Sequence, residues 1–197
     1  MWPWEHLAFG YLLYSGVCRA VSRRRPTDVD AIVLGVATQF PDLVDKPGSW
    51  VLGVLPSGTS VAHSVFVTVP ATLAAVVVAR RRGRPELGIA FAVGYLSHLL
   101  GDVLYTVLLG DGPAVGAVVW PLGPARAARS TGVVTRVLRF FDLYVDRLAS
   151  PAGLGYVLLE VSLLGLALAL WVADGRPGLA TIGRGRDRLR GRDGRGD

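Results

Sequence analysis

The chain has little of the polar chemistry that most soluble proteins carry. Only 18% of its 197 residues are charged, whereas 51% are hydrophobic, which is too apolar for an ordinary soluble domain of this size. It contains one cysteine, so a disulfide within the chain and a multi-cysteine metal site are both excluded. Lysine occurs once, as Lys46, and histidine three times, as His6, His63 and His98. The composition predicts a membrane protein.

Basic charge is almost entirely arginine, and it lies in clusters after apolar segments and in the C-terminal region. The net charge of +6 could suggest nucleic-acid binding. The apolar segments favour membrane lipid as the anionic partner instead, and we expect no binding of nucleic acid. No basic residue precedes the first apolar segment, so the pattern of a cleavable signal peptide is missing.

Apolar segments alternate with short polar breaks along the chain. Five are expected to be helices in a membrane: residues 4–21, 29–40, 61–79, 86–110 and 153–173. Asp28 suits the N-cap of the second segment and Pro41 its end, with a loop over 42–58. Residues 133–148 mix apolar and charged side chains at helical spacing, which predicts an amphipathic helix. The expected fold is an all-α, multi-pass transmembrane bundle of four or five membrane segments and this amphipathic helix.

Residues 1–174 are expected to form one membrane-embedded domain, and residues 175–197, rich in Arg, Gly and Asp, a disordered tail. The positive-inside rule places the arginine clusters and the tail in the cytoplasm. The protein is therefore expected in the cell membrane as a multi-pass protein, with the opposite ends of the segments in the outer half of the bilayer. The sequence does not determine the oligomeric state.

Polar residues from four separate segments converge on that outer half. They are His6, Asp42, Asp45, His63, His98 and Asp102. His98 and Asp102 are four residues apart inside an apolar helix, so both face the same side. Buried histidine and carboxylate are costly in a membrane unless they serve a purpose. Imidazole and carboxylate ligands without thiolate suit a divalent ion, most of all zinc, with manganese and iron as alternatives.

Five of these residues are predicted metal ligands: His6, Asp42, His63, His98 and Asp102. Asp45 is predicted as a further ligand, a residue behind the ligands or a catalytic group, and Glu160 in the last apolar segment as a candidate for acid–base chemistry. Simpler interpretations stay open for each. Asp45 and Lys46 could form a solvated pair, Glu160 could pair with an arginine of the 133–148 helix, and His98 and Asp102 could hydrogen-bond to each other or to another helix. More than four candidate ligands also leaves a two-metal centre open.

Short motifs in this order carry a resemblance to a known family. They are His6-x-x-x-Gly10, the Pro-Asp-Leu-Val-Asp run that ends at Asp45, His63-Ser64, the Gly-Tyr-Leu-Ser-His run that ends at His98 and is followed by Asp102, and Trp120-Pro121. The pattern resembles the YdjM-like family of inner-membrane proteins, which are described as metal-dependent hydrolases; some members carry a LexA-regulated or LexA-binding label. Members often have a second histidine and an arginine just before the His-Ser pair, and this chain has neither.

The resemblance implies a membrane-bound hydrolase in which water activated by the metal attacks an ester or phosphoester. A site inside the membrane suggests a small-molecule or lipid-linked substrate. Two other functions stay open at this point. Buried acids and histidines could bind a cation or relay protons in a transporter, or the protein could be a non-catalytic membrane scaffold.

Overall fold

The computed structural model describes residues 1–108, 115–123, 132–151 and 153–179, and every regular element among them is a helix. The helices are α1 (Pro3–Val21), α2 (Asp28–Trp50), α3 (Val65–Arg81), α4 (Pro85–Leu108), the short α5 (Val115–Val118), α6 (Val133–Ala149) and α7 (Gly153–Ala173). The expected all-α class is confirmed. The tail predicted to be disordered lies mostly outside the described residues.

Helix α2 differs from the prediction at both ends. Its N-cap is Thr27, whose hydroxyl accepts from the Asp30 amide, and Asp28 is instead its first residue. The predicted stop at Pro41 is wrong, because the helix continues through Pro41 and Pro47 to Trp50. A proline removes one helical hydrogen bond but has a helical φ angle. Here the loss is offset by burial, since Pro41 and Asp45 are both fully buried.

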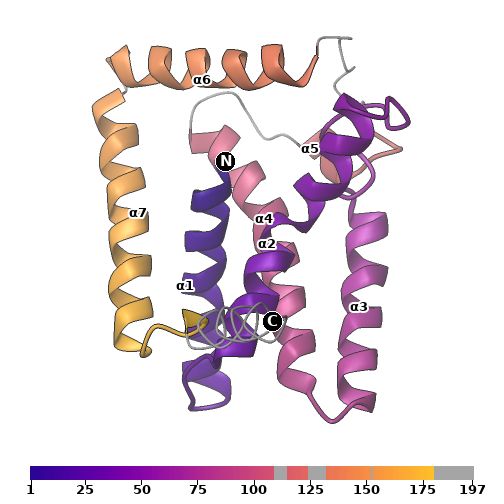
Figure 1. The fold of residues 1–197 in the computed structure, drawn as a ribbon, viewed down its shortest axis with the longest axis vertical. Coiled ribbons are helices and arrows are strands. Elements are labelled where there is room, and N and C mark those ends of the chain that lie inside the picture. Colours follow the sequence, from indigo (N-terminus) through magenta and orange to yellow (C-terminus); the bar gives the residue numbers. More distant parts are fainter. Residues whose placement is uncertain (109–114, 124–131, 152, 180–197) are drawn as a thin grey trace, which may run out of the picture.

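The helices run alternately up and down as an antiparallel bundle (Figure 1). Helix α4 packs against α1, α2 and α3, and α7 lies on the outside of α1. Helix α6 runs across one end of the bundle, crosswise to the other long helices, and leads into α7. We call this end the α6 end. The opposite end carries the arginine clusters that follow α1 and α3, and we call it the arginine end.

Close helix packing brings α1, α2 and α4 together. Tyr14, Leu34 and Ala90, one from each helix, are fully buried in the core. Toward the α6 end, Gly94 of α4 lies against α2 so closely that a Cβ atom there would be 2.7 Å from the Ala37 Cβ. This approach places the α2 backbone next to the side chains of α4.

Two of the described helices, α4 and α7, are long and apolar enough to cross a membrane. Helix α7 has leucine and valine side chains exposed along much of its length, as expected of a helix that faces lipid. Helix α6 has no buried residue, and many of its apolar side chains are exposed. Its amphipathic pattern confirms the sequence prediction for 133–148.

Candidate metal centre

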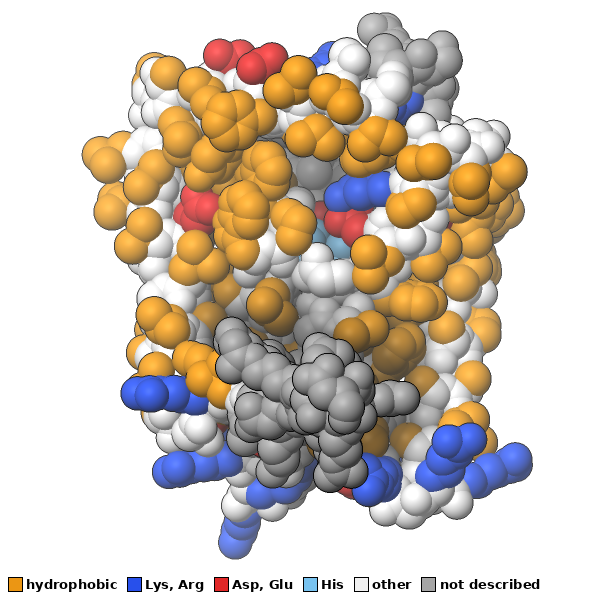
Figure 2. Space-filling model, in the orientation of Figure 1, with side chains coloured by type: hydrophobic (Ala, Val, Ile, Leu, Met, Phe, Trp, Pro, Cys, Tyr) orange, Lys and Arg blue, Asp and Glu red, His pale blue; other side chains and the backbone are white. Residues whose placement is uncertain are grey.

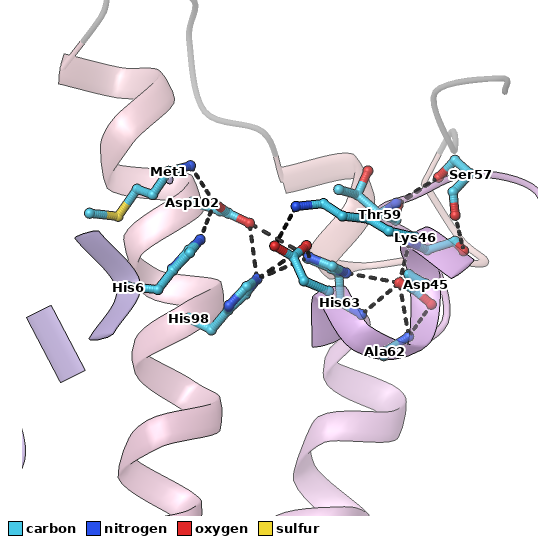
Figure 3. A network of polar contacts seen from close by, with 12 residues as sticks. Met1, His6, Asp45, Lys46, Ser57, Thr59, Ala62, His63, His98 and Asp102 are labelled. Carbon is cyan, nitrogen blue, oxygen red and sulfur yellow. Dashed lines mark hydrogen bonds and ion pairs between the residues drawn. The ribbon is translucent and has the colours of Figure 1, made fainter. Parts of the chain in front are cut away.

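Five side chains predicted from the sequence meet near the α6 end of the bundle (Figure 3). They form two groups whose ligand atoms lie within 4.8 Å of one another. One group is Asp42, His63 and His98, and the other is His6, His98 and Asp102. Helices α1, α2 and α4 and the segment before α3 each supply at least one of them. The expected convergence of separate segments is therefore present in the structure.

His98 is oriented by the backbone of α2. Its Nδ1 lies 2.6 Å from the carbonyl oxygen of Thr38. A carbonyl can only accept, so Nδ1 carries the proton and Nε2 keeps a free lone pair. The side chain is fully buried, and the close packing of α2 on α4 holds the two atoms together. Nothing in the sequence marks Thr38, because its role depends on its carbonyl and not on its side chain.

His63 is oriented by Asp45 in the same way. Asp45 Oδ2 lies 2.8 Å from His63 Nδ1, and the Asp45 carboxylate also accepts from the amides of Ser60 and Ala62. The loop after α2 thus closes around this carboxylate, and Ser64 caps the start of α3 directly after the histidine. A carboxylate on one imidazole nitrogen is a common way to fix a histidine whose other nitrogen binds metal.

The remaining histidine nitrogens and two carboxylates face a common point. His63 Nε2 and His98 Nε2 are 3.2 Å apart. Asp42 Oδ1 lies 3.5 Å from His63 Nε2 and 3.9 Å from His98 Nε2. Asp102 Oδ2 lies 3.6 Å and 3.5 Å from the same two nitrogens. Ligands at about 2.0–2.1 Å from a tetrahedral zinc ion are about 3.3 Å apart, so these separations fit such an ion.

His6 contacts the other side of Asp102. Its Nε2 lies 3.3 Å from Asp102 Oδ1, which also accepts from the amino group of Met1. The His6 ring stacks on that of His98, with centroids 3.7 Å apart. His6 Nδ1 is buried and has no hydrogen-bond partner among the described residues. His6 therefore holds both Asp102 and His98 in place.

The charge at His63 follows from its neighbours. Asp45 lies at its Nδ1, and Asp42 and Asp102 lie at its Nε2. When no metal is bound, a proton on Nε2 can be shared with these carboxylates and with His98 Nε2, 3.2 Å away. A metal ion bound at the same point would have to displace that proton.

Lys46 and Glu160 pair with other residues than the simpler interpretations of the sequence predicted. Lys46 forms an ion pair with Asp42, one helical turn before it, and not with Asp45, which is fully buried. Glu160 accepts hydrogen bonds from Trp4 Nε1 and from the hydroxyl of Tyr144 in α6. It belongs to neither ligand group among the described residues. The structure thus brings Lys46 to the centre and leaves Glu160 in a separate contact between helices.

Comparisons with known proteins give one match. No curated protein and no solved structure matches the chain. The family model for the YdjM inner membrane protein matches residues 1–177, which include all of the candidate ligands. That match covers most of the chain. The chain therefore belongs to the YdjM inner membrane protein family.

Proposed function

We propose that this membrane protein is a metal-dependent hydrolase whose divalent ion is held by Asp42, His63, His98 and Asp102. One observation carries the proposal. His63 Nε2 and His98 Nε2 lie 3.2 Å apart, and each lies 3.5–3.9 Å from an oxygen of Asp42 and of Asp102, while the Nδ1 atom of each ring is already hydrogen-bonded elsewhere. A proton on His63 can bridge these atoms when no metal is bound, and a divalent ion in its place could be held by all four side chains at once.

The donor set favours zinc, with manganese and iron as alternatives. Two imidazoles and two carboxylates suit these ions, and the two nitrogens lie at distances from each other and from each carboxylate that are close to those of tetrahedral ligands. A single ion is favoured over a pair. Both ligand groups depend on His98, and only its Nε2 is free to bind. In this proposal His6 and Asp45 position ligands: His6 holds Asp102, and Asp45 holds His63.

The chemistry proposed is hydrolysis of an ester or phosphoester. A divalent ion lowers the pKa of water to about 7 and so supplies a nucleophile at neutral pH. The chain's own residues hold that ion, fix both histidine tautomers and exclude bulk water, since the three histidines are almost fully buried. The prediction of acid–base work by Glu160 gains no support, because its carboxylate is taken up by Trp4 and Tyr144.

A multi-pass topology fits the bundle. We infer that α1, α2 and α3 cross the membrane together with α4 and α7, because they run alternately beside these two spans. The arginine end would then face the cytoplasm, and the metal centre would lie in the outer half of the bilayer. A protease site placed at the arginine end tests this orientation. Cleavage of that site by a membrane-impermeant protease from the cytoplasmic side alone would support it.

Metal content and hydrolysis test the function together. We expect protein purified in lipid nanodiscs to bind about one zinc ion, and the variants His98→Ala and Asp102→Ala to lose it. Chelator-sensitive hydrolysis should appear in a panel of soluble and lipid esters and phosphoesters, and zinc should restore it. The matched control Asp142→Ala removes a carboxylate from α6, outside both ligand groups, and should keep both properties.

Two results would contradict the proposal in different ways. If zinc, manganese and iron all fail to bind with His98-dependent affinity, there is no metal centre of this kind. If a metal binds but no substrate in the panel is hydrolysed, the centre handles a cation without catalysis. That second result would favour the transporter hypothesis.

A further inference from the structure

The proposed metal centre opens toward the side of the bundle. The side chains of His6, His63 and His98 are at most 3% exposed, whereas those of Asp42 and Asp102 are 12% and 25% exposed. Figure 2 shows the same feature from outside: acidic, basic and histidine side chains gather in a hollow on one face. Hydrophobic side chains surround that hollow, and the basic residues of the arginine end lie well away from it.

The depth of the centre matches the boundary between lipid head groups and chains. Asp102 lies six residues before the end of α4, which is about 9 Å along a helix. The 24 residues of α4 span about 36 Å, slightly more than the hydrocarbon thickness of about 30 Å. If α4 is centred in the bilayer, Asp102 lies only a few ångströms inside the hydrocarbon edge.

Helix α6 lies across one end of the bundle (Figure 1) and reaches the last turn of α2. Phe140 of α6 packs on Trp50 in the last turn of α2, with ring centroids 5.9 Å apart. Arg136, one turn earlier in α6, lies over the same indole ring at 5.6 Å. These two contacts tie α6 to the end of α2 that carries Lys46.

Cations gather at the mouth of the centre. The Lys46 ammonium pairs with Asp42 and lies 5.8 Å from the centroid of the Trp50 ring, which Arg136 also contacts. Lys46 is 30% exposed and points toward the cluster in Figure 3. An ammonium has three protons to donate, and Asp42 takes one of them. With a divalent ion bound, the ion, Lys46 and the Met1 amino group would carry four positive charges against the three carboxylates of Asp42, Asp45 and Asp102, which favours an anionic ligand.

We propose that the metal centre takes a lipid-like amphiphile with an anionic phosphoryl head group, which reaches it sideways from the membrane and is bound by Lys46. This inference rests on the proposed metal centre and adds the substrate class and a specificity residue. A lipid already sits at the right depth, so its head group has to move only a short way. Its chains stay against the hydrophobic face that surrounds the hollow.

Binding to a cobalt-loaded centre tests this without relying on turnover. Cobalt(II) replaces zinc in such sites, and its visible absorption changes when an anion approaches the ion. We would titrate cobalt-loaded protein in nanodiscs with dodecylphosphonate, its uncharged dimethyl ester and methylphosphonate. The amount of each dodecyl compound dissolved in the nanodisc is measured separately, so that accumulation in the membrane is not counted as binding.

We expect dodecylphosphonate to change the cobalt spectrum at a local concentration at least tenfold below that of methylphosphonate, and the dimethyl ester to have no effect. Lys46→Met should weaken dodecylphosphonate binding about tenfold or more, and Lys46→Arg should restore most of it. Arg81→Met, which removes a cation at the arginine end, is the matched control and should bind like the unchanged protein. The cobalt affinity of each variant is measured first.

Three other results would each overturn one part of the proposal: the route of the ligand, the role of Lys46 or the metal centre. Equal local affinity for dodecylphosphonate and methylphosphonate would mean that the ligand comes from water, not from the membrane. Unchanged anion binding in Lys46→Met, at unchanged cobalt affinity, would remove Lys46 from recognition. Failure of the unchanged protein to bind cobalt or zinc would overturn the metal centre itself, and is thereby distinguished from failure of the lipid proposal.

Discussion

Single residues decide whether the histidines can present their nitrogens to an ion. Asp45 fixes His63 through Nδ1 without facing the other donors. Replacing Asp45 with Asn keeps the size but removes the charge, so His63 is held less firmly and is a weaker ligand. We expect Asp45→Asn to lower zinc affinity about 10–100-fold. Competition with a coloured chelator measures this directly.

Comparison with His63→Ala separates positioning from ligation. His63→Ala should lose high-affinity binding, whereas Asp45→Asn should weaken it and leave about one ion per chain at saturation. Asp146→Asn in α6 changes an acid in the same way outside the ligand groups and serves as the control. An equal loss of zinc affinity in Asp45→Asn and Asp146→Asn would mean that affinity depends on the overall negative charge and not on the contact of Asp45 with His63.

Zinc affinity should also depend on pH through His63. The neighbouring carboxylates favour a proton on Nε2, the nitrogen that the ion needs. Zinc must displace this proton, so zinc affinity should fall as the pH is lowered. Calorimetry in buffers of different ionisation enthalpy should show proton release on zinc binding. A pH-independent affinity would exclude His63 as a ligand.

Most candidate ligands could be predicted from the sequence because burial makes them costly. His98 and Asp102 stood out as polar residues in an apolar helix, and the other ligands followed from their order along the segments. The roles of Thr38 and Lys46 could not be predicted. Thr38 acts through its carbonyl. Asp42 and Lys46 are one helical turn apart, so their ion pair could be predicted only if the helix were known to continue beyond Pro41.

At the scale of helices, the approach of α4 to α2 determines the geometry of the centre. A Cβ atom at Gly94 would lie 2.7 Å from the Ala37 Cβ and 2.9 Å from the Leu34 carbonyl oxygen. The backbone cannot yield without moving the helix, so Gly94→Ala should separate α2 from α4 and cost about 1–3 kcal/mol. Because the Thr38–His98 contact crosses this interface, zinc affinity should fall as well.

Gly165→Ala in α7 is the control for that change. A Cβ atom there meets nothing within 4 Å. Thermal unfolding and zinc titration of both variants should show a loss for Gly94→Ala alone. If Gly94→Ala kept full zinc affinity, the close approach of these helices would not be what positions His98.

Helix boundaries show where sequence patterns are reliable. The ends of α6 and α7 agree with the apolar pattern to within a residue, because composition changes sharply there. Helix α2 was predicted ten residues too short, since a proline after an apolar run usually ends a helix. Its continuation depends on tertiary burial of Pro41 and Asp45, which local sequence cannot report.

For the whole molecule, the bound ion should act as a cross-link between segments distant in the chain. The four proposed ligands come from α2, the segment before α3 and α4, so an ion at their centre stabilises only the folded state. Free zinc at 100 times its dissociation constant should add about 2.7 kcal/mol to the free energy of unfolding. The unfolding midpoint should rise with zinc, and the rise should be absent in His98→Ala.

Family membership, suggested by the motifs, was confirmed at this scale by the match over residues 1–177. The number of membrane crossings remains a prediction, because only α4 and α7 meet the length and hydropathy of a span on their own. In α2 the apolar run is interrupted by the acids of the centre. The acids that we propose as ligands thus lower the hydropathy by which a membrane span is recognised.

All four proposed ligands lie within the first 102 of the 197 residues. During synthesis they leave the ribosome before α6 and α7 have been made. A growing chain can therefore capture its ion while the bundle is still four helices, and the later helices close over a centre already assembled. Metal supply in the cell would then act on the nascent protein, long before any substrate is met.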